Sequence, residues 1–229
     1  MINLAAAAAA FIAIHLLVSG TQVRDALTGR IGQGPYMGLF ALSSIVLLVW
    51  MGWSYALVGH AAANSLYWDV TPTTRLVQLA LTLVAFLFIV PGLATPNPTS
   101  VRQEGALERP DAVKGMLRIT RHPFLWGVAV WAAGHLIVNG DMASFILFGS
   151  LLVLAVLGTS SIDAKRKRAL GATWDAFTAQ TSNLPFAAIL AGRQRLNLGE
   201  IGWRLALAVV VWALFAFVHP WLFGVRALP

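Results

Sequence analysis

Three of the five histidines in this chain lie inside long apolar stretches of sequence. His15 stands between Ile14 and Leu16, His135 lies in WAAGHLIVNG, and His219 lies in AFVHPWLFG. An ionisable side chain is costly in such surroundings, so each of these residues is a candidate for function. A neutral imidazole can bind a transition metal or hydrogen-bond to a neighbouring helix. The pattern therefore predicts one of these two roles for each of the three.

The other two histidines lie at the ends of apolar stretches. His122 opens the stretch TRHPFLWG, in which Pro123 suits the first turn of a helix. With Arg118 and Arg121 beside it, this helix start is expected to form a corner that binds an anion. His60, in VGHAAAN, is expected to lie at a water boundary.

The chain contains no cysteine, which limits the metal chemistry that the histidines can support. Disulfides, iron–sulfur clusters, thiolate-ligated haem and a cysteine nucleophile are all excluded. Buried imidazoles without thiols suit a haem held between two histidines on facing helices. His122 and His135 cannot be that pair, because on one helix they differ by about 20 Å in depth and about 220° in direction. Spacing alone does not choose the pair.

Composition identifies the elements that must position these residues. Of the 229 residues, 58% are hydrophobic and 11% are charged, and the mean hydropathy is +0.74. A soluble domain carries about 25% charged residues, so the chain is predicted to be an integral membrane protein. Its net charge of +7 is then expected to reflect loops that face the cytoplasm, and nucleic acid is not expected as a partner.

The apolar stretches predict an all-α bundle of about six transmembrane helices in a single domain, residues 1–229. Odd-numbered loops carry 14 Lys and Arg residues, whereas even-numbered loops and the tail carry two. The positive-inside rule then places both termini outside the cytoplasm. The first stretch has no basic start and is expected to be retained as a span. The predicted spans are residues 2–20, 36–58, 76–95, 123–139, 142–162 and 203–223.

Two connections are informative. Asn139-Gly140-Asp141 is a short turn, which predicts that the fourth and fifth spans form an antiparallel hairpin. The fifth loop begins with the basic run from Lys165 to Arg168, which is expected to fix topology and to contact anionic lipids.

Four segments resemble the NnrU family of bacterial membrane proteins, in order and over essentially the whole chain. That family is similar to the 15-cis-zeta-carotene isomerases of plants and cyanobacteria, and more distantly to isoprenylcysteine and phospholipid methyltransferases. The most specific part is the block that runs from RITRHP through AGH to NG. The four segments are IHLLVSGTQVR, GMLRITRHPFLWGVAVWAAGHLIVNGD, DAKRKRALGATWDAFTAQTSNLPF and FAFVHPWLFG.

The resemblance implies a haem b protein of the bacterial inner membrane, linked to denitrification and nitric oxide metabolism. In the isomerase the haem iron is needed to isomerise a carotenoid double bond. By motif, its two iron ligands fall on His15 and His135 of this chain. A thiol that precedes the second ligand by three residues in the isomerase is Ala132 here, which argues against a cysteine-linked ligand switch.

Depth does not match easily for this pair, because His15 and His135 are expected to differ by about 10 Å along the membrane normal. Helix tilt could close part of that difference. His122 opposite His15, or His219 opposite His135, are the alternative pairs. Arg118, Arg121 and His122 are candidates to bind the haem propionates, since Arg suits bidentate recognition of carboxylates.

Three functions therefore stay open. The first is a haem protein for redox or nitric oxide chemistry, with a redox partner, and the second is a haem-dependent isomerase whose apolar substrate enters from membrane lipid. The third, an S-adenosylmethionine-dependent methyltransferase, is weakened because the family's RHPxYxG motif reads RHPFLWG here and its later acidic and aromatic block is only partly matched. That block corresponds to Asp163, Gly171, Trp174 and Phe177. The sequence does not identify a catalytic residue.

Overall fold

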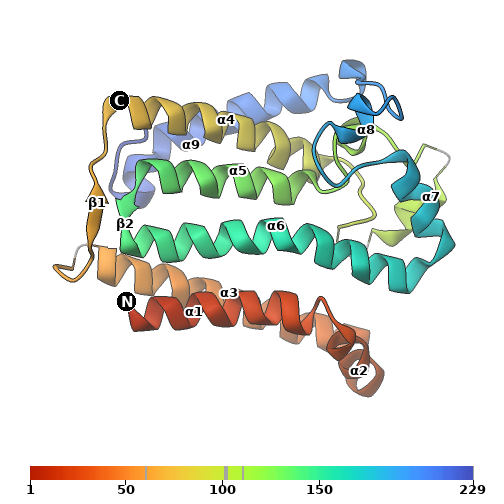
Figure 1. Ribbon diagram of the computed structural model, residues 1–229, viewed down its shortest axis with the longest axis horizontal. Coiled ribbons are helices and arrows are strands. Elements are labelled where there is room, and N and C mark those ends of the chain that lie inside the picture. Colours follow the sequence, from red (N-terminus) through yellow and green to blue (C-terminus); the bar gives the residue numbers. More distant parts are fainter. Residues whose placement is uncertain (60, 101–102, 110, 229) are drawn as a thin grey trace.

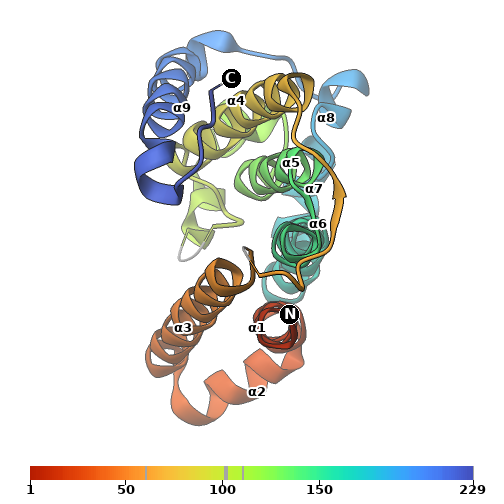
Figure 2. The ribbon, with the colours of Figure 1, turned by 90° about the vertical axis from the view of Figure 1, so that its left-hand side faces the viewer.

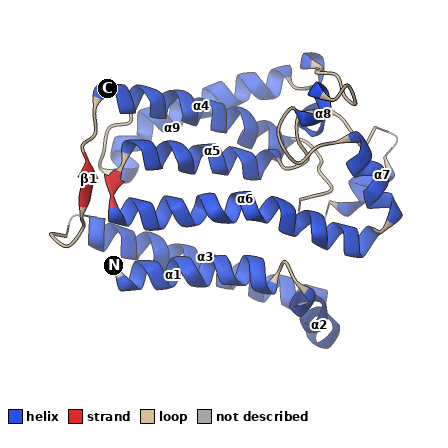
Figure 3. Ribbon diagram, viewed as in Figure 1, coloured by secondary structure: helices blue, strands red, loops and turns tan. Residues whose placement is uncertain are grey.

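The fold is built almost entirely of helices that run along one axis (Figures 1 and 3). The structure is a computed structural model, and it describes residues 1–59, 61–100, 103–109 and 111–228. His60 lies outside the described residues. Both chain termini lie at the same end of the bundle, together with a small two-stranded sheet (Figure 1).

A helix forms at each of the six predicted spans. Four helices are long and apolar enough to cross a membrane, which indicates a multi-pass membrane protein. The first span is bent by 80° where α1 and its continuation meet α2 (Gln22–Ile31), and this pair would make a fifth crossing. The helix at the remaining predicted span, α5 (Pro123–Val138), has 16 residues and is about 24 Å long, which is less than the hydrocarbon thickness of about 30 Å. The four long helices are α3 (Gln33–Gly59), α4 (Pro72–Ala94), α6 (Met142–Leu170) and α9 (Gly202–Phe223).

Viewed along their axes, the helices form one curved layer (Figure 2). The order in this layer is α9, α4, α5 and α6, followed by α1 (Ile2–Ala13) and α3, which both contact α6. Large apolar side chains of α3 and α9, the helices at the two ends of the layer, are exposed, as expected for faces in contact with lipid. Examples are Leu42, Val49, Val210 and Phe217.

The poly-alanine stretch of α1 lets this helix pack closely on its neighbours. Leu4, Ala7 and Ala8 are buried against Met51 of α3 and Ala143 of α6. Small side chains allow helix backbones to approach within a membrane, where a hydrophobic driving force between helices is missing. The start of α1 therefore lies beside the start of α6, and the two helices run in the same direction (Figure 1).

A short π-helical segment, η1 (Ile14–Val18), continues α1 and carries His15. Segments of this kind are rare and occur frequently at functional sites. The chain then turns at Gly20, where an added Cβ would overlap the Ser161 hydroxyl of α6. Thr21 caps α2 by accepting a hydrogen bond from the Val23 amide. Gly20 is thus needed for the close contact that fixes η1 on α6.

A strand pair joins the connections at the end of the bundle that holds the termini. β1 (Leu66–Trp68) pairs antiparallel with β2 (Gly140–Asp141), which occupies the predicted turn between the fourth and fifth spans. An added Cβ at Gly140 would overlap the Trp68 carbonyl oxygen, so glycine permits the pairing. Asp141 caps α6 by accepting from the Ser144 amide at 3.0 Å.

The opposite end of the bundle holds the short elements (Figure 1). Two packed clusters join the connection before α5 to the connection after α6. Met116 and Ile119 are buried with Ile201, and Leu117 is buried with Trp174 and Phe177. The short elements are η2 (Glu104–Glu108), η3 (Gly115–Arg118), α7 (Ala172–Gln180), α8 (Ala187–Leu190) and η4 (Leu198–Glu200).

Candidate functional site

His135 lies between aromatic side chains in the middle of the helix layer. Its ring stacks on Phe148 of α6 with the centroids 4.6 Å apart. The ring of Trp131, one turn earlier in α5, has its centroid 4.5 Å away. Gln78 reaches His135 from α4, where its amide Nε2 lies 2.8 Å from Nδ1. Gly134 makes this approach possible, because an added Cβ would overlap Oε1 of Gln78.

The hydrogen bonds of His135 fix the role of each ring nitrogen. Nδ1 lies 2.9 Å from the Trp131 carbonyl oxygen, which can only accept, so Nδ1 carries the proton. The Gln78 amide nitrogen cannot accept this proton, but turning the amide by 180° would present to the N–H the Oε1 atom, which is buried without a partner in the described ranges. Nε2 then carries the lone pair. This tautomer is the one that metal-ligating histidines adopt when their other nitrogen donates to a carbonyl.

His15 repeats this arrangement on the other side of α6. Its Nδ1 lies 2.7 Å from the Phe11 carbonyl oxygen one turn earlier, which leaves the lone pair on Nε2. Its ring is 4.4 Å from the Phe11 ring and meets the ring of Phe40 in α3 edge-on at 5.1 Å. Within the described ranges, no hydrogen bond reaches Nε2 of either His15 or His135.

His219, near the end of α9, is the third intramembrane histidine. Its Nδ1 lies 2.8 Å from the Val225 carbonyl oxygen, and its ring lies 4.8 Å from that of Phe223. His219 and His135 both lie near the C-terminal ends of their helices, at the end of the bundle that holds the chain termini. Their pairing on one iron remains a prediction.

The structure does not bring His15 and His135 to the same level. Gly20 faces Ser161, so His15 lies level with a point about five residues before Ser161 on α6. His135 stacks on Phe148, which is about eight residues further back and therefore about 12 Å away along the helix. The depth difference expected from the sequence is thus present in the fold.

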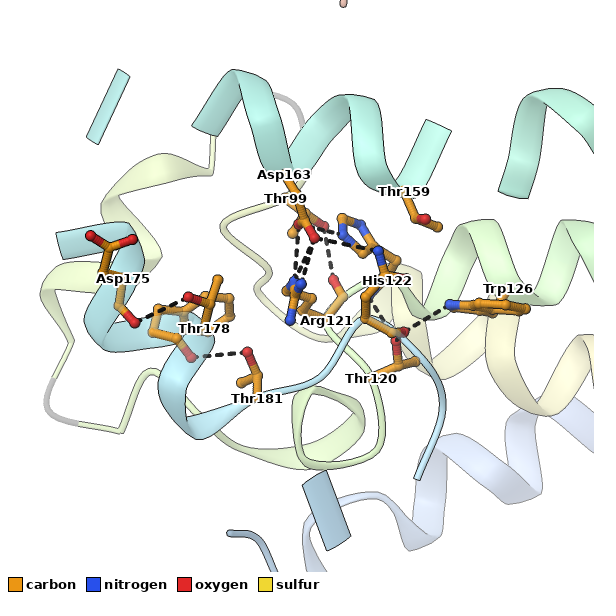
Figure 4. Close-up of polar contacts among 12 residues, drawn as sticks. Thr99, Thr120, Arg121, His122, Trp126, Thr159, Asp163, Asp175, Thr178 and Thr181 are labelled. Carbon is orange, nitrogen blue, oxygen red and sulfur yellow. Dashed lines mark hydrogen bonds and ion pairs between the residues drawn. The ribbon is translucent and has the colours of Figure 1, made fainter. Parts of the chain in front are cut away.

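A second polar site surrounds Asp163, at the opposite end of α5 (Figure 4). Arg121 donates to both carboxylate oxygens, with Nε at 2.9 and 3.0 Å from Oδ1 and Oδ2. His122 Nε2 lies 2.7 Å from Oδ1, and the Asn183 amide donates to Oδ2 at 3.3 Å. One carboxylate of α6 therefore holds the residues before α5 and the segment after α7.

Backbone contacts complete the cluster around Asp163. The Arg121 amide donates to the Ser182 carbonyl oxygen at 2.9 Å, and the Arg121 carbonyl accepts from Thr99 at 3.0 Å. Trp126 Nε1 donates to the Asn183 carbonyl at 2.8 Å. Three stretches of chain that are distant in sequence are thus bound to one another at the start of α5 (Figure 4).

The His122 imidazole is almost fully buried, with 1% of its side chain exposed. Burial lowers its pKa, although the Asp163 carboxylate acts in the opposite direction. Nε2 donates to Asp163. Nδ1 has no hydrogen-bond partner in the described part of the chain.

Arg118 makes a separate ion pair with Glu200, just before α9. Its Nε and Nη2 donate to the two carboxylate oxygens at 2.9 and 2.8 Å, and Nη1 donates to Gln194 at 2.9 Å. The Gly115 amide also donates to Glu200, at 2.6 Å. Hydrogen bonds from Arg118 lower the pKa of Glu200 to about 2. This pair fastens η3 to the start of the last span.

The Arg118–Glu200 pair predicts a pH dependence of stability. Because its folded-state pKa is depressed, Glu200 contributes stability above about pH 4.5, and this contribution is lost as the pH falls towards about 2. We expect Glu200→Gln to lower the unfolding free energy by about 1 kcal/mol at pH 7 and to have little effect near pH 2. Thermal unfolding in detergent at a series of pH values measures this.

The matched control is Asp111→Asn, which removes an ion pair with Lys114 that is exposed on both sides. We expect no measurable change from this control. A destabilisation by Glu200→Gln that is equal at all pH values would contradict the assigned role of the carboxylate charge.

These ion pairs bear on the prediction that Arg118, Arg121 and His122 bind haem propionates. Glu200 and Asp163 already occupy the donors that propionates would need. A role in propionate binding remains a prediction, and it would require Arg118 or Arg121 to exchange its carboxylate partner.

Sequence reasoning missed several residues of these sites. Gln78 and Phe148 gave no local signal, because their contacts with His135 join different helices. Asp163 was considered only as part of a methyltransferase-like block. An acidic residue at the end of an apolar stretch is itself a signal, since such residues are expected to have a partner.

The sequence of the chain matches the model of the NnrU protein family over residues 3–227. The chain belongs to the NnrU family. Among curated proteins, this NnrU-family protein is similar to the chloroplastic 15-cis-zeta-carotene isomerases of Zea mays and Arabidopsis thaliana. Each is 26% identical over 180 residues, which cover 76% of this chain and 47% of the relative. The chain thus spans about half the length of the curated relatives it matches.

No solved structure matches the fold closely enough to be informative. In the described part of the chain, no group of three or more His, Asp or Glu residues is arranged to hold a metal ion. The methyltransferase alternative gains no support from the family or from these relatives.

Proposed function

We propose that this NnrU-family protein binds haem b through His135 and isomerises a cis double bond of a long apolar polyene. The observation that carries the proposal is the setting of His135. It is an intramembrane imidazole between two aromatic rings, with Nδ1 held by a carbonyl and Nε2 available. The long apolar helices around this site support its position within a membrane, which we take to be the bacterial inner membrane.

The donor chemistry at His135 suits one axial ligand of haem. A neutral imidazole whose second nitrogen donates to the protein is the usual form of such a ligand. His219 and His15 are the candidates for a second ligand. His219 lies at the same end of the bundle as His135, whereas His15 is offset by about 12 Å along α6 and would need a displacement of α1 to share one iron.

The surrounding residues have separable roles at this site. Trp131 and Phe148 exclude water and provide flat apolar walls for a planar cofactor or a polyene. The Trp131 carbonyl keeps the proton on Nδ1, and Gln78 packs against the same ring nitrogen. When bound, haem would supply an iron whose reactivity is tuned by its axial ligand and by burial.

The similarity to two 15-cis-zeta-carotene isomerases supports the choice of substrate class. A polyene of this kind dissolves in lipid, and the exposed apolar side chains along the outer helices suit a substrate that enters from the bilayer. The link to denitrification and nitric oxide, with a redox partner, remains the alternative within the same family.

Haem binding is tested first. We expect protein purified after expression with added haem to show a Soret band, and His135→Ala to lose it. The matched control is Gln78→Leu, which removes a neighbour of His135 but no ligand, and is expected to retain the band with a shifted maximum. A second ligand is identified if His219→Ala or His15→Ala converts a six-coordinate spectrum to a five-coordinate one. A Soret band that is unchanged in His135→Ala would contradict the assignment.

The reaction is tested separately with the reduced wild-type protein. We expect conversion of 15-cis-zeta-carotene to the isomer with a trans central bond, measured by chromatography. The His135→Ala variant is expected to be inactive. Haem binding without any conversion would disprove the isomerase assignment and favour the redox alternative.

A further inference from the structure

An apolar segment at the end of the bundle opposite the chain termini is exposed on one side. The segment, residues 184–190, contains α8 and the three residues before it. Leu184 is 59% exposed, Phe186 is 43% exposed and Leu190 is 86% exposed. The other side of the segment is packed, because Ala188 is fully buried and Ile189 contacts a buried cluster of the core. The 184–190 segment therefore has one apolar face on the protein and one that faces outwards.

The conformation of Phe186 shows that this outward face is held in place. Its φ of 64° lies in the left-handed region, which is uncommon for a bulky side chain. Such strain persists only where the surrounding structure fixes it. The Phe186 amide donates to the Ile119 carbonyl oxygen at 2.8 Å, and its ring meets the Phe88 ring of α4 edge-on at 6.4 Å. The exposed apolar side chains thus belong to a firmly attached element.

The contact with Phe88 sets the depth of the segment. α4 has 23 residues and is about 34 Å long, so only about 4 Å of it extends beyond a hydrocarbon core of about 30 Å. Phe88 lies about 9 Å before the end of α4 and is therefore inside the core. The Phe186 ring touches it and lies at the edge of the core. Viewed along the helix axes, α8 projects from the helix layer beside α4 (Figure 2).

The backbone of the segment suits this depth. Irregular backbone is tolerated at the level of the hydrocarbon only where its polar groups are bonded within the protein. Besides the Phe186 amide, the Ala188 amide donates to the Ser182 hydroxyl at 3.0 Å and the Leu190 amide donates to the Phe186 carbonyl oxygen at 2.9 Å. Bonded amides together with exposed leucines fit an apolar surrounding better than water.

The segment also adjoins the start of α5, which is too short to cross the membrane. Trp126, in the first turn of α5, donates to the carbonyl oxygen of Asn183, just before the segment. α5 falls about 6 Å short of the hydrocarbon thickness, so an apolar element beside its start completes this span. Arg195 follows the segment and is exposed, which suits contact with anionic headgroups.

We propose that the 184–190 segment is a membrane anchor, which inserts Leu184, Phe186 and Leu190 into the hydrocarbon edge of one leaflet. Arg195 then lies among the headgroups of that leaflet, and the partner is a membrane that contains anionic phospholipid. Because Asn183 accepts a hydrogen bond from Trp126, the anchor fixes the depth at which α5 starts. The proposal does not depend on whether the protein binds haem.

The test uses the absence of cysteine, since one introduced cysteine carries a label at one known position. Leu190→Cys is labelled with nitrobenzoxadiazole, and the full-length protein is placed in nanodiscs of phosphatidylcholine and phosphatidylglycerol. Quenching of the fluorescence is measured with lipids that carry a nitroxide at a shallow or a deep position of the acyl chain, and with iodide in the water. We expect strong quenching by the shallow nitroxide and little by iodide. Leu184→Cys provides a second, independent position.

Two labelled controls define the scale. Val210→Cys, exposed to lipid inside α9, is expected to be quenched best by the deep nitroxide. Thr173→Cys, exposed on α7, is expected to be quenched by iodide alone.

The headgroup contact is tested by attaching the shallow nitroxide to phosphatidylglycerol or to phosphatidylcholine. We expect the phosphatidylglycerol form to quench Leu190→Cys more effectively, by up to about fivefold, the ratio that one Arg near a membrane surface supplies. Arg195→Gln is expected to abolish this preference. Arg226→Gln removes the same charge from an exposed position after α9, at the opposite end of the bundle, and is expected to leave the preference unchanged.

Quenching of the label at Leu190 by iodide, as at Thr173, would place the segment in water and overturn the proposal. Protection from iodide and from both nitroxides would also overturn it, because a protein partner would then cover the segment. Equal quenching by the two headgroup forms would contradict the role of Arg195.

Discussion

Replacing Asp163 with alanine is expected to lower the unfolding free energy by about 3–5 kcal/mol. The carboxylate accepts hydrogen bonds from Arg121, His122 and Asn183. Its removal leaves the charge of Arg121, whose side chain is 12% exposed, without a counter-charge, and leaves the Nε2–H of a buried imidazole without an acceptor. An unpaired buried charge is the costliest outcome of breaking an ion pair.

Reversible unfolding in mixed detergent micelles measures this loss. Asp163→Asn is expected to be less harmful, because an amide oxygen still accepts one hydrogen bond. Asp175→Ala is the matched control, since Asp175 pairs with Lys167 where both side chains are more than half exposed. Such pairs contribute up to about 1 kcal/mol. If Asp163→Ala and Asp175→Ala were equally stable, Asp163 would not hold this end of the bundle together.

The position of Asp163 shows what the sequence could predict and what it could not. Hydropathy located the helix at each of the six predicted spans, because apolar stretches are set by local composition. It placed the end of the fifth span at residue 162, whereas α6 continues to Leu170. Lys, Arg and Ala are good helix formers, so the helix extends beyond the apolar stretch until Gly171, which adopts a φ of 53°. Asp163 is therefore helical and rigidly placed.

The side chains that contact each candidate histidine could not be predicted from the sequence, because these contacts depend on tertiary packing. His135 was a candidate from its type and surroundings alone, yet its contacts with Gln78 and Phe148 follow from how α4 and α6 pack on α5. The π-helical turn at His15 likewise has no composition signal. The strand pair at Gly140 was missed because its strands have three residues or fewer.

Gly127 is one of the glycines that allow α4 and α5 to pack closely, and its replacement is expected to have the second large effect. An added Cβ would lie 2.5 Å from Cγ1 of Ile89, 2.9 Å from the Ala85 carbonyl oxygen and 3.0 Å from the Ile89 amide nitrogen. Two of these three contacts are with backbone atoms, which cannot move away by changing rotamer. We therefore expect Gly127→Ala to cost about 1–3 kcal/mol and Gly127→Val to cost more.

Gly149→Ala in α6 provides the matched control, because no atom lies within 4 Å of its added Cβ. Alanine favours a helix over glycine by about 1 kcal/mol, so this control is expected to be neutral or stabilising. We thus predict that Gly127→Ala lowers the unfolding free energy and that Gly149→Ala does not. Unfolding in mixed micelles measures both changes.

Because α4 also carries Gln78, separation of α4 from α5 by Gly127→Val is expected to shift the Soret maximum of a haem bound at His135. Stabilisation by Gly127→Ala would show that α4 and α5 are not in close backbone contact.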